Sequence, residues 1–179
     1  MAPRILPGQA FVTDFCSTLD GEPWAAPSSA TSPLLQFHLL IIYRGVQCSH
    51  CKKQLIEFES RIGEFSQRNV SVFAASADTQ QRALQAASEW NLKQLRLGYS
   101  LELGAIQRAG AFISQANKPT EMPQFSEPAV FLIKPDLTLF AAWISSFPFA
   151  RPKVDDLLQC IDFVVENSIL PRGTAHSPN

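Results

Sequence analysis

The chain has 179 residues, of which 46% are hydrophobic and 17% are charged, and its formal net charge is −1. This apolar content is enough to build a core, so the composition excludes an intrinsically disordered chain. The near-neutral charge argues against a dedicated nucleic-acid binder, which would carry a basic stripe. The length suits one α/β domain, and we expect residues 1–179 to form it, with residues 171–179 as a frayed polar tail.

Cysteine usage and hydropathy together indicate a reducing location. Four cysteines are too few for a disulfide-stapled secreted scaffold, and only Cys48 and Cys51 are close in sequence. The first ten residues lack the apolar segment of a signal peptide, and the longest apolar run is far shorter than a membrane span. We therefore expect a cytoplasmic protein without a membrane partner. In that setting a close cysteine pair is more often catalytic or metal-binding than structural.

Strands and helices alternate through the first two-thirds of the chain. The run at residues 37–43 is apolar throughout, which is typical of a strand that is covered on both faces. A loop rich in Pro, Ser and Ala precedes it at residues 23–33. The predicted elements are strands at 9–17, 37–43, 70–75 and 95–99 and helices at 49–68, 79–90 and 101–109. The residues expected to face inward from the helix at 79–90 are Ala83, Leu84, Ala87 and Trp90.

The last part of the chain predicts a hairpin followed by a long helix. Residues 115–127 are polar and contain prolines, so we expect a loop there. The strands at residues 129–134 and 138–144 flank a turn too short for a crossover, and they must therefore be antiparallel. The final helix, at residues 154–167, carries one apolar stripe of Val154, Leu157, Leu158, Ile161, Val164 and Val165. Together these elements predict an α/β fold with a central mixed sheet and helices on both faces.

Cys48 and Cys51 belong to the motif Cys-Ser-His-Cys, which lies between a predicted buried strand and a predicted helix. At a helix N-terminus the backbone N–H groups lack partners and the macrodipole is positive. A thiolate there is stabilised, so its pKa falls below that of a free cysteine. Two intervening residues bring both sulfurs to one helical turn, which suits reversible dithiol–disulfide exchange. His50, between the cysteines, is expected to favour the thiolate further.

A zinc site is the main alternative for such a pair. Structural zinc takes four Cys or His ligands, usually from two close pairs. The sequence has no second pair, and Cys16 and Cys160 are isolated in apolar surroundings. We therefore expect redox chemistry without a metal or cofactor, and we expect Cys16 and Cys160 to be inert buried thiols. A redox-sensing or interaction module without efficient turnover is a further alternative.

Four segments of the chain match the pattern of one known family. They are the stretch at 42–52, which contains Tyr-Arg-Gly and the cysteine motif, and residues 72–78, 125–131 and 147–152. With these segments the chain resembles the AhpC/TSA peroxiredoxin-like branch of the thioredoxin-fold superfamily over nearly its whole length. The resemblance implies a thioredoxin-like fold with a peroxiredoxin-type N-terminal extension. It also implies an antioxidant thiol-dependent oxidoreductase that reduces protein disulfides or small hydroperoxides, is regenerated by a cellular dithiol reductant and forms a homodimer.

The resemblance also suggests residues that support the cysteine pair. Pro128 precedes a strand, as does the proline of thioredoxin-like proteins whose cis peptide bond lies against the cysteines, so we expect a cis bond here. Pro128 also stands where peroxidases of this family carry an arginine that helps to bind peroxide. Arg44 and Arg151 are therefore candidates for a substitute cation.

The order in which the two cysteines react has two interpretations. By analogy with thioredoxin, Cys48 is the exposed nucleophile and Cys51 resolves the intermediate. By the spacing of typical peroxiredoxins, counted from Tyr43, Cys51 occupies the position of the peroxide-attacking cysteine. The sequence leaves both assignments open.

Overall fold

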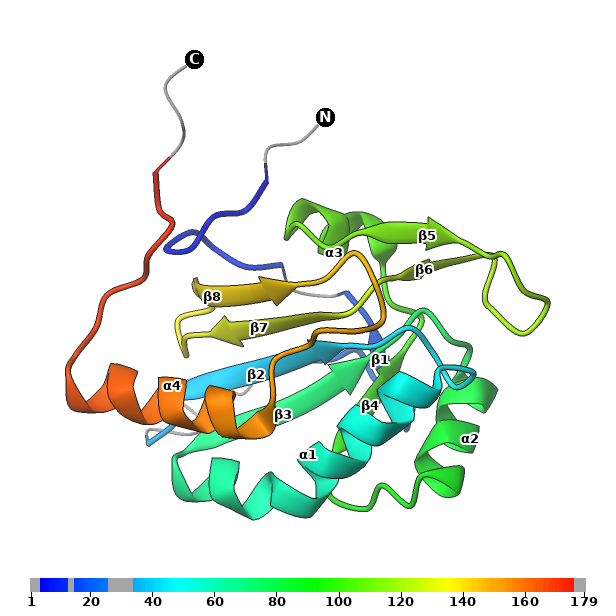
Figure 1. Cartoon of the computed structure of the whole chain (residues 1–179), viewed down its shortest axis with the longest axis horizontal. Helices are drawn as coiled ribbons and strands as arrows, with labels where there is room; N and C mark the ends of the chain where they lie inside the picture. The colour runs from blue at the N-terminus through cyan, green and yellow to red at the C-terminus, as the bar shows by residue number, and fades with distance from the viewer. Residues whose placement is uncertain (1–3, 13–14, 26–33, 176–179) are drawn as a thin grey trace.

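The computed structural model describes residues 4–12, 15–25 and 34–175, and a six-stranded mixed sheet lies at its centre (Figure 1). The strands of this sheet are β1 (Ser17–Thr18), β2 (Phe37–Ile42), β3 (Val70–Ala75), β4 (Arg96–Tyr99), β7 (Ala129–Ile133) and β8 (Leu139–Ile144). A separate two-stranded hairpin consists of β5 (Ile113–Gln115) and β6 (Gln124–Ser126). The helices are α1 (Ser49–Gln67), α2 (Gln80–Glu89), α3 (Leu103–Arg108) and α4 (Val154–Glu166).

Strand β2 lies in the middle of the sheet, whose strand order is β1-β4-β3-β2-β7-β8. It runs parallel to β3, and β3 runs parallel to β4, whereas β7 is antiparallel to both β2 and β8. These pairings confirm the predicted mixed sheet and the predicted antiparallel hairpin. Every residue of β2 is buried, as its continuous apolar sequence predicts.

Helices cover both faces of the sheet, as predicted. On one face, Leu39 of β2 belongs to a core cluster with Phe58 of α1 and with residues of α2 and α4. On the other face, Leu40 belongs to a second cluster with Ile106 of α3 and Phe15 of the N-terminal segment. The alternation of side chains along β2 therefore divides its apolar run between two cores. None of the helices in the described ranges is long and apolar enough to cross a membrane.

The predicted strand at residues 9–17 is wrong for most of its length, since only its last residue belongs to β1. Instead of continuing a ladder of its own, the segment lies along the β7–β8 hairpin. The backbone N–H groups of Gly8 and Phe11 donate to the carbonyls of Leu139 and Leu137, each at 2.7 Å. Residues 13–14, residues 26–33 of the predicted loop and residues 176–179 of the predicted tail lie outside the described residues.

The segment at residues 115–127 is not a simple loop, because β6 lies within it and β5 ends at its start. The two strands pair antiparallel, with Ser114 opposite Phe125. The buried ring of Phe125 fixes the hairpin to the rest of the protein, whereas Gln115 and Gln124 are exposed. A short strand pair with one face in solvent has few apolar residues, so its sequence reads as a loop.

Two side chains predicted to face inward are exposed. Leu84 of α2 is 48% exposed, because the buried face of that helix is formed by Ala83 and Ala86, and Leu84 lies a further 100° around the axis from Ala83. Val165 of α4 is 45% exposed, because the buried face of this helix ends at Val164. The other stripe residues of α4 are buried, as predicted.

We predict that Phe58→Ala lowers the free energy of unfolding by about 3–5 kcal/mol, because it leaves a cavity between α1 and the sheet. The matched control is Phe163→Ala on α4. Phe58 is fully buried and Phe163 is 59% exposed. The control should change stability by no more than about 0.5 kcal/mol. Urea unfolding followed by circular dichroism measures both, and equal losses would contradict the assignment of the core.

Candidate active site

The cysteine motif lies where the chain leaves β2 and enters α1. Cys48 is the N-cap of α1, and its Sγ accepts a hydrogen bond from the backbone N–H of Cys51 at 3.2 Å. The two cysteines form a disulfide, with their Cα atoms 5.2 Å apart. This Cα separation lies within the usual range for disulfides. The structure therefore confirms that both sulfurs meet in the first turn of a helix.

The disulfide is almost completely enclosed. Cys48 is 4% exposed and Cys51 is 0% exposed. Of the two residues, Cys48 is therefore the less buried. A small reactant is favoured over a bulky one by this enclosure.

Hydrogen-bond donors surround the two sulfurs. The backbone N–H of Arg44 donates to Cys51 Sγ at 3.4 Å. Nη2 of Arg151 lies 3.3 Å from Cys51 Sγ and 3.7 Å from Cys48 Sγ. Donors and positive charge favour the ionised form of a thiol over the neutral form. After reduction, this environment would therefore stabilise a thiolate.

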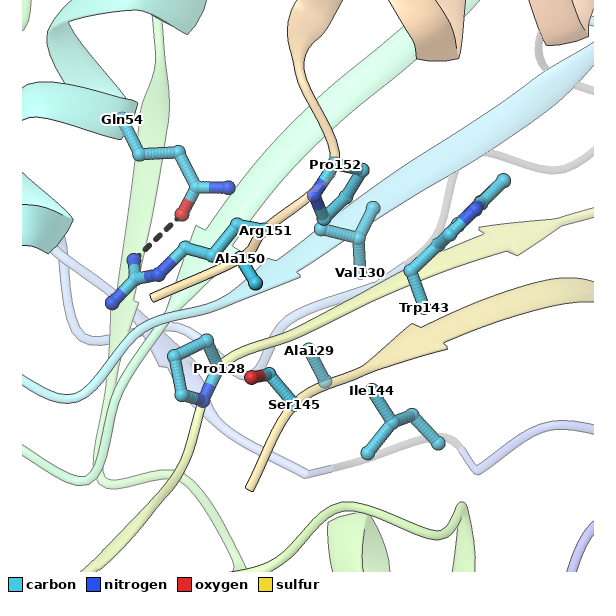
Figure 2. Close-up of a pocket in the computed structure, with 10 residues that line it drawn as sticks. All are labelled: Gln54, Pro128, Ala129, Val130, Trp143, Ile144, Ser145, Ala150, Arg151 and Pro152. Atoms are coloured by element: carbon cyan, nitrogen blue, oxygen red, sulfur yellow. Dashed lines mark hydrogen bonds between the residues drawn. The ribbon is translucent and has the colours of Figure 1, made fainter. Parts of the chain in front are cut away.

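The guanidinium of Arg151 is fixed in place by two further acceptors, of which Figure 2 shows Gln54. Nη1 donates to Gln54 Oε1 at 2.7 Å, and Nε donates to the carbonyl of Pro148 at 2.8 Å. Burial lowers the pKa of Arg151 to about 10, and the nearby charge of Arg44 lowers it too, whereas Glu127 opposes the shift. Arg151 therefore remains a cation at neutral pH, but in a poorly solvated position.

The side chain of Arg44 faces carboxylates rather than the sulfurs. Its Nη2 bonds Glu121 at 3.1 Å, and its Nε lies 3.1 Å from Glu127 in an ion pair whose N–H is not aligned for a hydrogen bond. The guanidinium carbon also lies 4.7 Å from the centre of the Phe125 ring. Of the two arginines predicted as a substitute cation, the structure therefore brings only the Arg151 guanidinium to the sulfurs.

His50 lies at the start of α1, but its ring packs against Phe149, with the ring centres 4.1 Å apart. Among the residues that the structure describes, it forms no hydrogen bond with either sulfur. The expected support of the thiolate by His50 therefore rests on its proximity in sequence and not on a contact.

The expected cis bond before Pro128 is wrong, since the described residues contain no cis peptide bond. Pro128 lies in an extended segment between β6 and β7, and backbone hydrogen bonds flank it on both sides. The N–H of Glu127 donates to the carbonyl of Phe112 at 2.8 Å, and the carbonyl of Pro128 accepts from Ser145 N–H at 2.9 Å. A trans bond, which X–Pro favours by about 0.5–1 kcal/mol, suits this straight passage from β6 to β7. Pro128 lines the same cavity as Arg151 (Figure 2).

A buried carboxylate holds the loop before the motif. Asp78 accepts hydrogen bonds from the N–H of Val46 at 2.8 Å and from Nε of Arg82 at 2.6 Å. Gly45 has a φ of +133°, and a Cβ there would lie only 2.7 Å from Gln47 Oε1 and 3.0 Å from the Asp78 carboxylate. A side chain here would be strained and would crowd the Asp78 carboxylate, so this position favours glycine.

The two remaining cysteines lie apart from the pair. Cys16 is buried, as predicted, and burial raises the pKa of its thiol to about 12. Cys160 is half-buried rather than buried, and burial raises the pKa of its thiol as well. Across the described ranges, no group of three or more His, Cys, Asp or Glu side chains is placed to hold a metal.

Sequence reasoning missed the residues that hold the two arginines. Gln54 is buried on α1, three residues after Cys51 and on the same face of the helix. A polar residue on an apolar stripe was the available signal. Glu121 and Glu127 gave no signal of their own, because they lie in a polar segment.

Solved structures with a peroxiredoxin fold resemble the chain. A cysteine-to-serine mutant of peroxiredoxin 6 from Arenicola marina has a TM-score of 0.72 at 16% identity, over 92% of this chain and 75% of that chain. Peroxidoxin BcpB from Mycobacterium tuberculosis has a TM-score of 0.69 at 16% identity, over 90% and 99%. Bacterioferritin comigratory protein from Xanthomonas campestris has a TM-score of 0.60 at 16% identity, over 94% and 99%. At such identities the likeness shows the thioredoxin-like fold alone.

Sequence comparison gives the family. Among curated proteins none matches the chain. The model of the AhpC/TSA family, however, matches residues 14–141, which is more than half of the sequence. The chain therefore belongs to the AhpC/TSA family, and its fold, its disulfide pair and this membership support thiol-dependent reduction of peroxides or disulfides.

Proposed function

We propose that the chain is a thiol-dependent peroxidase that uses Cys48 and Cys51 to reduce small hydroperoxides. One observation carries the proposal: the Arg151 guanidinium lies against both sulfurs of a disulfide at the start of α1. A fixed cation at this point stabilises the attacking thiolate and the negative charge that develops on the peroxide oxygen. Alkyl peroxide reduction activity is reported for the Xanthomonas campestris bacterioferritin comigratory protein.

In the proposed reaction the Cys48 thiolate attacks one peroxide oxygen. The O–O bond breaks, Cys48 becomes a sulfenic acid, and the leaving oxygen takes a proton to form water or an alcohol. The Cys51 sulfur then attacks the Cys48 sulfur, the S–S bond forms, and the displaced hydroxyl leaves as water with the Cys51 proton. A cellular dithiol reduces the disulfide by two successive thiol exchanges and becomes a disulfide itself.

The small exposed fraction of the pair favours this order of attack. Cys48 is 4% exposed as a residue while Cys51 is 0% exposed, which favours Cys48 as the attacking cysteine. The same enclosure favours a hydroperoxide over a protein disulfide. A disulfide in a protein substrate can react only with a cysteine sulfur that its bulky surroundings allow it to approach. A redox sensor, the alternative function, would form the same disulfide but would not be turned over.

Three expectations from the sequence stay predictions alongside this function. They are the single domain over residues 1–179, the cytoplasmic location and the homodimer. Size-exclusion chromatography with light scattering measures the last of these directly.

We predict that Cys48→Ser abolishes hydroperoxide turnover with a dithiol reductant, because the attacking sulfur is lost. Cys51→Ser should react with one equivalent of hydroperoxide and stop as a sulfenic acid, which dimedone traps. The control is Cys160→Ser, which should keep wild-type turnover. Turnover that survives Cys48→Ser would contradict the assignment of the nucleophile. Disulfide formation without turnover in the wild type would favour the sensor.

We predict that the thiols of the reduced protein separate by pH in iodoacetamide labelling, which requires thiolate. Cys48 should label with a midpoint below the free value of about 8.5. Cys16 should stay unlabelled at pH 8, because burial raises its pKa to about 12 and its thiolate is scarce there. Mass spectrometry of the tryptic peptides quantifies each site.

The same labelling tests the role of Arg151. Removing a cation next to a thiolate raises the thiol pKa, so Arg151→Met should move the Cys48 midpoint up by about 1 unit or more. Arg151→Lys keeps the charge and should move it less. An unchanged midpoint in Arg151→Met would refute the electrostatic role of this arginine.

A further inference from the structure

A cavity of about 330 Å³ lies between the β7–β8 hairpin and the loop of residues 145–152 (Figure 2). Arg151, which lines it, also contacts both sulfurs of the cysteine pair. Val130, Trp143, Ile144 and Pro152 form most of its apolar wall, while Gln54, Ser145 and Arg151 are its polar side chains. In Figure 2 the Arg151 guanidinium lies toward one end and Trp143 toward the other. The volume is that of a pocket for a small organic molecule, with an apolar body and one cationic end.

In the disulfide state Arg151 has only uncharged partners. Its hydrogen bonds go to the carbonyl of Pro148, the amide oxygen of Gln54 and the two disulfide sulfurs. No carboxylate in the described ranges forms an ion pair with it, and the nearby Glu127 is paired with Arg44. A partly buried cation without a counterion is costly, and the lowered pKa of Arg151 agrees with this.

Reduction of the pair changes this balance. A thiolate at the position of Cys48 or Cys51 would lie within 3.3–3.7 Å of Arg151 Nη2 and would neutralise it. Formation of the disulfide removes that negative charge, because neither bonded sulfur is ionised. The need of Arg151 for an anion therefore depends on the redox state of the pair.

We propose that this cavity binds a small carboxylate with an apolar body and that it binds it more tightly in the disulfide state. The carboxylate would pair with the guanidinium, where one N–H of Nη1 has no acceptor among the described residues. The apolar body would lie along Trp143 and Ile144. Linkage is reciprocal, so the ligand would stabilise the disulfide by the same factor. The inference rests on the proposed function only in requiring that the pair cycles between dithiol and disulfide.

The test uses octanoate and, as its uncharged counterpart, 1-octanol. Both are titrated calorimetrically into the full chain, oxidised with diamide or reduced with a phosphine. We expect octanoate to bind the disulfide form at least about 10-fold more tightly than the dithiol form, and octanol to show no such preference. A tenfold preference corresponds to a fall of about 30 mV in the reduction potential at saturating octanoate, which a redox titration measures.

Two variants assign the effect to the cavity. Arg151→Met should remove the redox preference of octanoate but keep octanol binding, whereas Arg151→Lys should retain part of the preference. Trp143→Ala should weaken both ligands in both redox states. Circular dichroism checks that each variant is folded.

Three results would overturn the inference: no octanoate binding to the disulfide form below millimolar concentration, equal octanoate affinity in both redox states, or a preference that survives Arg151→Met. None of them depends on peroxide turnover, since diamide makes the disulfide. A failure of the peroxidase assay would therefore leave this test intact, and a failure here would leave the peroxidase proposal standing.

Discussion

The Nη2 of Arg151 lies against both sulfurs of the Cys48–Cys51 pair, and the organisation of the site depends on this contact. It joins the start of α1 to a loop that is 100 residues further along the chain. Without it, the sulfurs would keep only two backbone donors, the N–H of Cys51 in α1 and the N–H of Arg44 in the preceding loop. The contact also sets the chemistry, since a fixed cation in a poorly solvated place acts more strongly on a thiolate than one in water. Gln54 and Pro148 hold the guanidinium, so they belong to the same unit.

The charges around the pair come in two layers. The inner layer contains Arg151, with neutral partners, while the outer layer contains Arg44, which is balanced by Glu121 and Glu127. The guanidinium of Arg44 is directed to these two carboxylates, whereas its backbone N–H reaches Cys51. Glu121 lies in the loop that joins β5 to β6, and Glu127 directly follows β6, so the hairpin fixes the position of the outer layer. Of the two arginines, Arg151 is therefore the one whose guanidinium contacts the sulfurs.

The strands and helices with clear apolar patterns could be predicted from the sequence, because the spacing of apolar residues indicates which side chains are buried. The strand–motif–helix context of Cys48 and Cys51 follows from that pattern. Arg151 as a site residue came only from the family resemblance, since 100 residues separate it from Cys51 and periodicity carries no long-range contacts. Gln54 was missed because a pattern search counts apolar positions and passes over the polar one among them. The hairpin that contains Phe125 was missed for the opposite reason, since a solvent-facing strand pair has little apolar signal.

The short span between the α-carbons of Cys48 and Cys51 affects how the protein withstands excess oxidant. At 5.2 Å the backbone is already placed for ring closure, so a sulfenic acid on one sulfur meets its partner without unwinding of α1. Irreversible conversion to sulfinic acid requires a second oxidant molecule to arrive before that closure. A preformed turn therefore shortens the vulnerable interval. In the proposed peroxidase cycle, the local geometry of the helix start would thus limit hyperoxidation.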